Sequence, residues 1–62
     1  MTYQEAKEAL KTRAPVKLDG ITYKHINAII FRKTEVEIIE LELQAIKGNS
    51  ITIARLEQVE CI

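Results

Sequence analysis

Residues Ile21 to Ala45, with the sequence ITYKHINAIIFRKTEVEIIELELQA, decide the fold, because little else in the 62-residue chain is large and apolar enough to form a core. Their apolar and β-branched residues favour two long strands folded on each other at Lys33-Thr34. In the first strand Ile26, Ala28 and Ile30 share one face whereas Ile29 and Phe31 occupy the other, and in the second strand the apolar side chains change face at Ile38-Ile39. This change of phase indicates either two buried faces or a β-bulge, so we expect a bent hairpin.

The segments around this hairpin predict one helix and several short strands. Thr2 to Arg13 is expected to be helical, because Thr2 can cap it, Glu5 stands at the capping-box spacing and Pro15 ends it. Asp19-Gly20 lies between alternating residues and predicts a tight type I′ hairpin turn. The other expected elements are strands at 16–18, 51–54 and 59–62, a turn at 47–50 and a helical or 3₁₀ turn at 55–58.

These elements predict an α+β, mainly β fold, with residues 1–62 in a single domain. A helix followed by about five short antiparallel strands with tight turns is the outline of a small SH3-like or Sm-like barrel. A domain of this size buries only about 60% of the surface that its unfolded chain exposes, so its stability is marginal. Cys61 alone cannot form an internal disulfide, and it and His25 are too few ligands for structural zinc. We therefore expect a homo-oligomer.

Composition and charge narrow the classes of function. The chain has 9 Lys and Arg and 9 Asp and Glu, a formal net charge of +0, whereas nucleic-acid binders usually carry a basic excess. It has no apolar run long enough to span a bilayer and no signal-peptide pattern, so no membrane partner is expected. The lone cysteine fits a reducing compartment, which predicts a cytoplasmic protein.

The residues that most often perform catalysis are poorly placed for it. His25 would need a nucleophile and an orienting partner, and the only serine, Ser50, falls in a predicted turn. Cys61 follows Glu60, an acidic neighbour expected to raise the pKa of the thiol, the opposite of activation. Both glycines belong to turns, so no phosphate-binding loop is predicted. We therefore expect no enzyme, no metal site and no cofactor.

The charges of the predicted hairpin are segregated between its two strands. The first strand has no acid between Ile21 and Lys33, whereas the second carries glutamates at positions 35, 37, 40 and 42, which should face solvent. Cross-strand ion pairs explain this arrangement simply. The functional alternative is a basic and aromatic strip that holds an anion, and its candidate ligand-binding residues are Tyr23, Lys24, His25, Arg32 and Arg55.

Three stretches resemble small accessory proteins of bacteriophages and prophages of Gram-positive bacteria: TYQEAKEALKTRAPV, LDGITYKHINAIIFRK and NSITIARLEQV. The resemblance covers most of the chain and implies an accessory role for a phage inside its host cell. Because such proteins often act by binding, it implies a counter-defence or host-modulating module that binds a host protein or sequesters a nucleotide-type immune signal. The helical opening is also similar to that of phage proteins that trap cyclic nucleotide messengers.

A second resemblance is to Sm-like RNA-binding proteins, since LDGITY is similar to their first motif and ITIARLEQVECI resembles their second. It implies a ring-forming oligomer with an N-terminal helix and five bent strands. The family's glycine after the first hairpin and its Asp-to-Asn spacing are missing, and Ala54-Arg55-Leu56 stands in place of an arginine-glycine pair. RNA is therefore the less favoured partner, and a structural or assembly protein is the third alternative.

Overall fold

The computed structural model describes all 62 residues and contains one helix and six strands. In chain order the elements are α1 (Tyr3–Thr12), β1 (Val16–Leu18), β2 (Ile21–Tyr23), β3 (His25–Lys33), β4 (Glu37–Gln44), β5 (Ile51–Arg55), the 3₁₀ turn η1 (Leu56–Gln58) and β6 (Val59–Cys61). No helix in the structure has the length and apolar character needed to cross a membrane.

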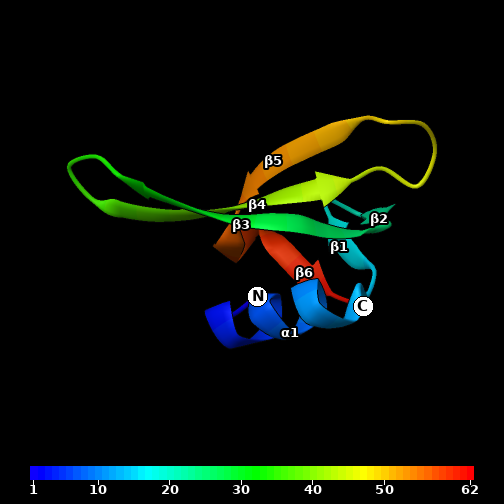
Figure 1. The fold of residues 1–62 in the computed structure, drawn as a ribbon, viewed down its shortest axis with the longest axis horizontal. Helices are drawn as coiled ribbons and strands as arrows, with labels where there is room; N and C mark the ends of the chain where they lie inside the picture. Colours follow the sequence, from blue (N-terminus) through cyan, green and yellow to red (C-terminus); the bar gives the residue numbers. More distant parts are fainter.

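The strands form two separate antiparallel sheets, with the orders β2-β1-β6 and β3-β4-β5 (Figure 1). The prediction of a five-stranded SH3-like or Sm-like barrel is therefore wrong. One reason lies at Lys24, which interrupts the long strand predicted from Ile21 to Lys33, so that β2 pairs with β1 in one sheet and β3 with β4 in the other. The turn η1 likewise carries the chain from β5 to β6, and no strand pair joins the two sheets into a closed cylinder.

The hairpin of β3 and β4 contains an irregularity at Asn27. Ile26 pairs with Leu43 and Ala28 pairs with Glu42, so Asn27 is the extra residue of a β-bulge. This confirms one of the two explanations for the change of phase in the sequence. Beyond the bulge, residues 29 and 31 fall on the same face as Ile26, and the even-numbered residues fall on the other.

The core lies on one face of the sheet β3-β4-β5, which α1 and the second sheet cover (Figure 1). Its buried side chains are Ala6, Ala9, Val16, Ile26, Leu41, Leu43, Ala54 and Val59. Leu41 and Leu43 have no exposed surface, so they lie on the inner face of β4, as expected from their alternation with the glutamates that were predicted to face solvent. The buried residues of α1 are both alanines, and such small side chains allow the helix to lie close to the sheet.

Local sequence signals account for the ends of α1 and for the first hairpin turn. The Thr2 hydroxyl accepts the backbone N–H of Glu5 at 3.1 Å, and the Glu5 carboxylate accepts the backbone N–H of Thr2 at 2.7 Å, which confirms the capping box. Arg13, at φ 57°, ends the helix in the left-handed region. Asp19 and Gly20 have φ values of 49° and 78°, the positive values that the predicted type I′ turn requires.

The far end of the β3–β4 hairpin, residues 31–39, projects beyond the rest of the chain, and we call it the arm (Figure 1). It makes the molecule 35 Å long but only 21 and 20 Å across. Its loop covers residues 34–36, slightly later than the predicted Lys33-Thr34 turn. Phe31 is 63% exposed, and its ring meets that of Tyr3 edge-on, with the centroids 5.7 Å apart.

Candidate functional site

One face of the sheet β3-β4-β5 packs on the core, and no element of the chain covers the opposite face (Figure 1). Side chains alternate along a strand, so the neighbours of buried Leu41, Leu43 and Ala54 must lie on that opposite face. We call it the open face. Its residues are His25, Ala28, Ile30 and Arg32 on β3, Ile38, Glu40, Glu42 and Gln44 on β4, and Ile51, Ile53 and Arg55 on β5.

The open face carries large apolar side chains although the core does not need them. Ile51 and Ile53 are 50% and 42% exposed, and Ile30 and Ile38 are half-buried. The strand register places Ile30 beside Glu40, and Ile53 beside Glu42. Apolar and charged side chains therefore share the same rows across the sheet, instead of forming separate patches.

Charges meet near the middle of the open face. The Arg32 Nε donates a hydrogen bond to the Glu40 carboxylate, the only ion pair in the structure. Arg55 lies directly opposite Glu40 on the neighbouring strand, so the carboxylate has an arginine on each side. Neither Arg55 nor Glu42 has an ion-pair partner of its own. The two side chains are thus free to meet charges supplied by another molecule.

The five predicted ligand-binding residues fall into two groups. Arg32 and Arg55 lie on the open face around Glu40. Tyr23, Lys24 and His25 lie at the junction of β2 and β3, where the Lys24 backbone N–H donates to the Gln44 carbonyl at 2.8 Å. His25 is opposite Gln44 and Arg32 is opposite Ile38, which separates the groups by about 20 Å along the sheet. The structure therefore does not bring all five together into one pocket.

Neither His25 nor Cys61 has the surroundings of a catalytic group. The buried His25 Nδ1 has no hydrogen-bond partner, and therefore no group orients the ring. Partial desolvation raises the pKa of the Cys61 thiol above its usual value of 9.0, and the nearby charge of Glu5 raises it further. The sequence predicts a raised pKa for the Cys61 thiol because of Glu60, whereas the acidic residue that raises this pKa in the structure is Glu5. No three His, Cys, Asp or Glu side chains are grouped closely enough to hold a metal ion.

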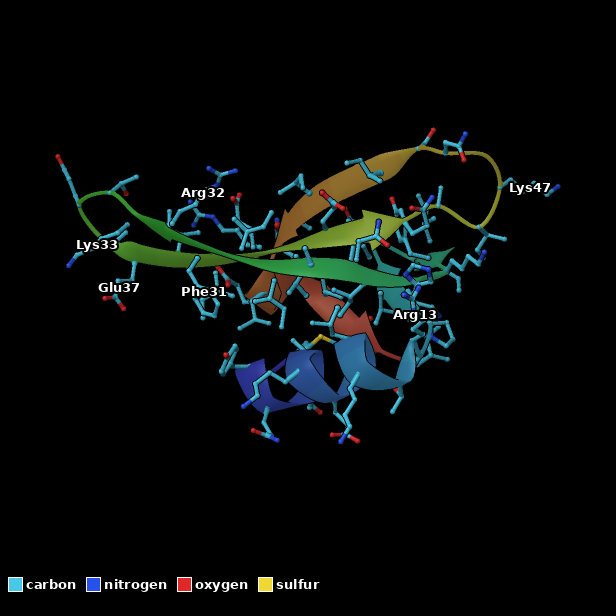
Figure 2. All side chains as sticks on the ribbon, in the orientation of Figure 1. Arg13, Phe31, Arg32, Lys33, Glu37 and Lys47 are labelled. Atoms are coloured by element: carbon cyan, nitrogen blue, oxygen red, sulfur yellow. The ribbon has the colours of Figure 1, made fainter.

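An open hollow of about 450 Å³ lies along the arm, and its lining residues are Phe31, Arg32, Lys33, Glu37, Ile38 and Ile39. Figure 2 shows that Arg32 and Phe31 point to opposite sides of the hairpin. Arg32 and Ile38 also belong to the open face, so the hollow continues that face toward the tip of the arm.

Sequence reasoning missed the apolar side chains of the open face. The sequence is compatible with two buried faces of β3 or with a bulge that shifts the phase, and only the bulge leaves Ile30 outside the core. The predicted turn at residues 47–50 could have shown how β5 pairs with β4. Folding the chain back there pairs Gln44 with Ile51 and therefore brings Arg55 opposite Glu40.

Comparisons of the chain with protein-family models, with curated proteins and with solved structures gave no match.

Proposed function

We propose that the protein is a non-enzymatic binding module that recognises another protein through its open face. The observation that carries this proposal is the combination of exposed isoleucines with the free charges of Arg55 and Glu42 on a sheet face that no element covers. Large apolar side chains exposed beside polar ones on an uncovered surface are a feature of protein interaction sites. The interspersed charges supply specificity for the partner.

The mixture of side chains on the open face favours a protein partner over a small anion. A nucleotide-type signal would need positive groups that converge without an acid between them. Glu40 lies between Arg32 and Arg55 and accepts a hydrogen bond from Arg32, which cancels part of their positive charge. Sequestration of a nucleotide-type signal and binding of RNA are therefore the competing functions, and titrations with nucleotides and RNA distinguish them from recognition of a protein.

The biological setting of the proposal comes from the resemblance to phage and prophage accessory proteins. In this setting the protein acts in the cytoplasm of the host cell, has a counter-defence or host-modulating role, and binds a host protein as a homo-oligomer. The positions that bear most directly on this role are Ile30, Ile53 and Arg55, because they place two apolar side chains and one positive charge on the same surface.

The experiment starts by identifying partners and then measures affinity. Immobilised protein is used to capture candidates from a lysate of a Gram-positive bacterium, and each candidate is then purified and titrated by calorimetry. The decisive variant is Ile30→Lys, which places a cation beside Glu40 and so keeps the sheet compatible with folding. We expect it to weaken binding by at least about tenfold, as for a central residue of an interface.

The matched control is Ile21→Lys, the same substitution at a residue of β2 that is 58% exposed and lies away from the open face. It should bind the partner like the wild type. Cyclic dinucleotides, ADP-ribose-type molecules and short RNAs are titrated in parallel. The proposal fails if a purified partner binds Ile30→Lys as tightly as wild type, or if only the nucleotides or RNA bind.

A further inference from the structure

Each three-stranded sheet has two outer strands, and three of these four strands carry features that discourage pairing with another chain. β2 and β6 have only three residues each, and the Met1 amino group donates to the Val59 carbonyl of β6 at 2.8 Å. β3 is bulged at Asn27 and ends in Arg32 and Lys33. Short strands, bulges and basic residues are the usual protection of sheet edges.

β5 lacks these features except for one basic residue, Arg55, at its end. Its sequence is Ile-Thr-Ile-Ala-Arg, with no proline, no lysine and no bulge, and it pairs only with β4. Its first and third residues, Ile51 and Ile53, are among the exposed large apolar residues of the protein. An edge strand of this composition is open to pairing with a further strand.

The hydrogen bonds show which backbone groups of β5 are free. The Ala45 N–H donates to the Ser50 carbonyl at 3.0 Å, so the antiparallel alternation turns the backbone groups of Thr52 and Ala54 toward β4. Those of Ile51, Ile53 and Arg55 face the open edge. The Arg55 N–H is already satisfied, because it donates to the Gln58 side chain at 3.0 Å. Ile51 and Ile53 therefore hold the free N–H groups of this edge.

We infer that β5 pairs antiparallel with β5 of a second copy, about a two-fold axis at Thr52. In this register Ile51 of one copy exchanges N–H···O bonds with Ile53 of the other, and the reverse pair does the same. The register uses both free donors and leaves the Arg55 N–H on Gln58. The product is a continuous six-stranded sheet with two open faces side by side.

The side chains of β5 suit this register. Ile51 and Ile53 become cross-strand neighbours of Ile53 and Ile51 from the other copy, an apolar pairing that stabilises adjacent strands. Arg55 meets Asn49 of the other copy, so no like charges are placed directly opposite each other. A pairing centred on Ile53 would instead require the Arg55 N–H that Gln58 already occupies. The self-complementary edge therefore favours a second copy over an unrelated strand.

Sedimentation velocity at increasing protein concentration tests the pairing. The wild type should show a monomer–dimer equilibrium, and Ile53→Lys should raise the dissociation constant of the dimer at least about tenfold, because lysine blocks strand edges. Ile21→Lys, the same change on the edge strand β2, should dimerise like the wild type. A wild type that stays monomeric at every concentration, or a dimer that survives Ile53→Lys, would overturn the inference.

Disulfide formation tests the register. In a Cys61→Ser background, Thr52→Cys should form an intermolecular disulfide, because a non-hydrogen-bonded pair on the axis has its Cα atoms about 4.5 Å apart. Ile53→Cys should not, since its two copies are diagonal neighbours about 7–8 Å apart. Faster cross-linking at position 53 would refute the register. The inference deepens the proposed homo-oligomer, and its failure would leave recognition by a monomeric open face intact.

Discussion

The two faces of the sheet β3-β4-β5 are built from the same strands but have different surroundings. On the inner face, Ile26, Leu41 and Leu43 are 2%, 0% and 0% exposed, whereas Ile51 and Ile53 on the open face are 50% and 42% exposed. Residue type therefore does not separate the faces, since both carry large aliphatic side chains. What separates them is that α1 and the second sheet cover only the inner face (Figure 1).

This difference follows from the size of the chain. A chain of 62 residues supplies one helix and one small second sheet, which together cover one face of the larger sheet. Antiparallel sheets can leave the other face to water, but that face is then usually polar. The isoleucines of the open face do not follow this pattern, and the binding of another molecule that we propose would account for them. Substitutions on each face can test this division between stability and binding.

The inner face should carry most of the stability. Leu41→Ala removes a fully buried side chain and leaves a cavity, so we expect it to lower the free energy of unfolding by about 2–5 kcal/mol. In a marginally stable protein this loss largely unfolds the chain. Urea denaturation compares it with Ile53→Ala on the open face, which should cost much less. If Leu41→Ala melts within a few degrees of wild type, the two faces have been assigned wrongly.

The sheet that covers the inner face depends on the turn between β1 and β2. Gly20 has a φ of 78°, and a Cβ added there would meet no atom within 4 Å, so Gly20→Val is opposed by backbone conformation rather than by a clash. We expect a loss of about 1–2 kcal/mol in the free energy of unfolding, the usual penalty for a left-handed residue with a side chain. Unchanged stability in thermal denaturation would show that the tight turn contributes nothing to the cover.

On the open face, charge should matter little for folding. Arg32 is exposed and its ion pair with Glu40 is at the surface, so Arg32→Ala should change the free energy of unfolding by under about 1 kcal/mol. Chemical denaturation of Arg32→Ala and of Arg55→Ala, each compared with wild type, measures the change in the free energy of unfolding. Both variants should fold normally while weakening binding to the partner. A larger loss of stability for Arg32→Ala than for Gly20→Val would make the ion pair a structural element and not a binding element.

The smallest effect concerns pH and the helix that covers the core. The hydrogen bond from the Thr2 backbone lowers the pKa of Glu5 below its usual value of 4.5. Because the pKa is lower in the folded state, the carboxylate stabilises the fold above the unfolded pKa, and this contribution disappears as the pH falls through the folded pKa. The free energies of unfolding of wild type and Glu5→Gln should therefore differ at neutral pH and become equal in acid. A difference that persists unchanged at low pH would rule out the charge as its source.

The parts of the fold that could be predicted from the sequence are local. The capping box at Thr2, the Asp19-Gly20 turn and the alternation around Leu41 each depend on residues close together in the chain. The prediction of a barrel is wrong because it concerns which strands pair, and strand pairing depends on residues far apart in the chain. Nothing near Lys24 announces that the strand breaks there and that its two halves enter different sheets.

The same reasoning explains the outcome for the candidate site. Arg32 and Arg55 meet around Glu40 because of pairing between three strands, whereas Tyr23, Lys24 and His25 stay at the other end of β3. Segregation of charge along the sequence reveals neither arrangement. The apolar half of the open face escaped prediction because isoleucines in strands were assigned to the core.

The central claim is that the open face binds a partner and is not needed for folding. Differential scanning calorimetry of Ile30→Lys, with and without the purified partner, tests both halves in one measurement, because a partner that binds the folded state raises its melting temperature. Ile30→Lys alone should melt close to wild type, and the partner should stabilise wild type but not the variant. Equal stabilisation of the two proteins by the partner, or unfolding of the free variant, would contradict the claim.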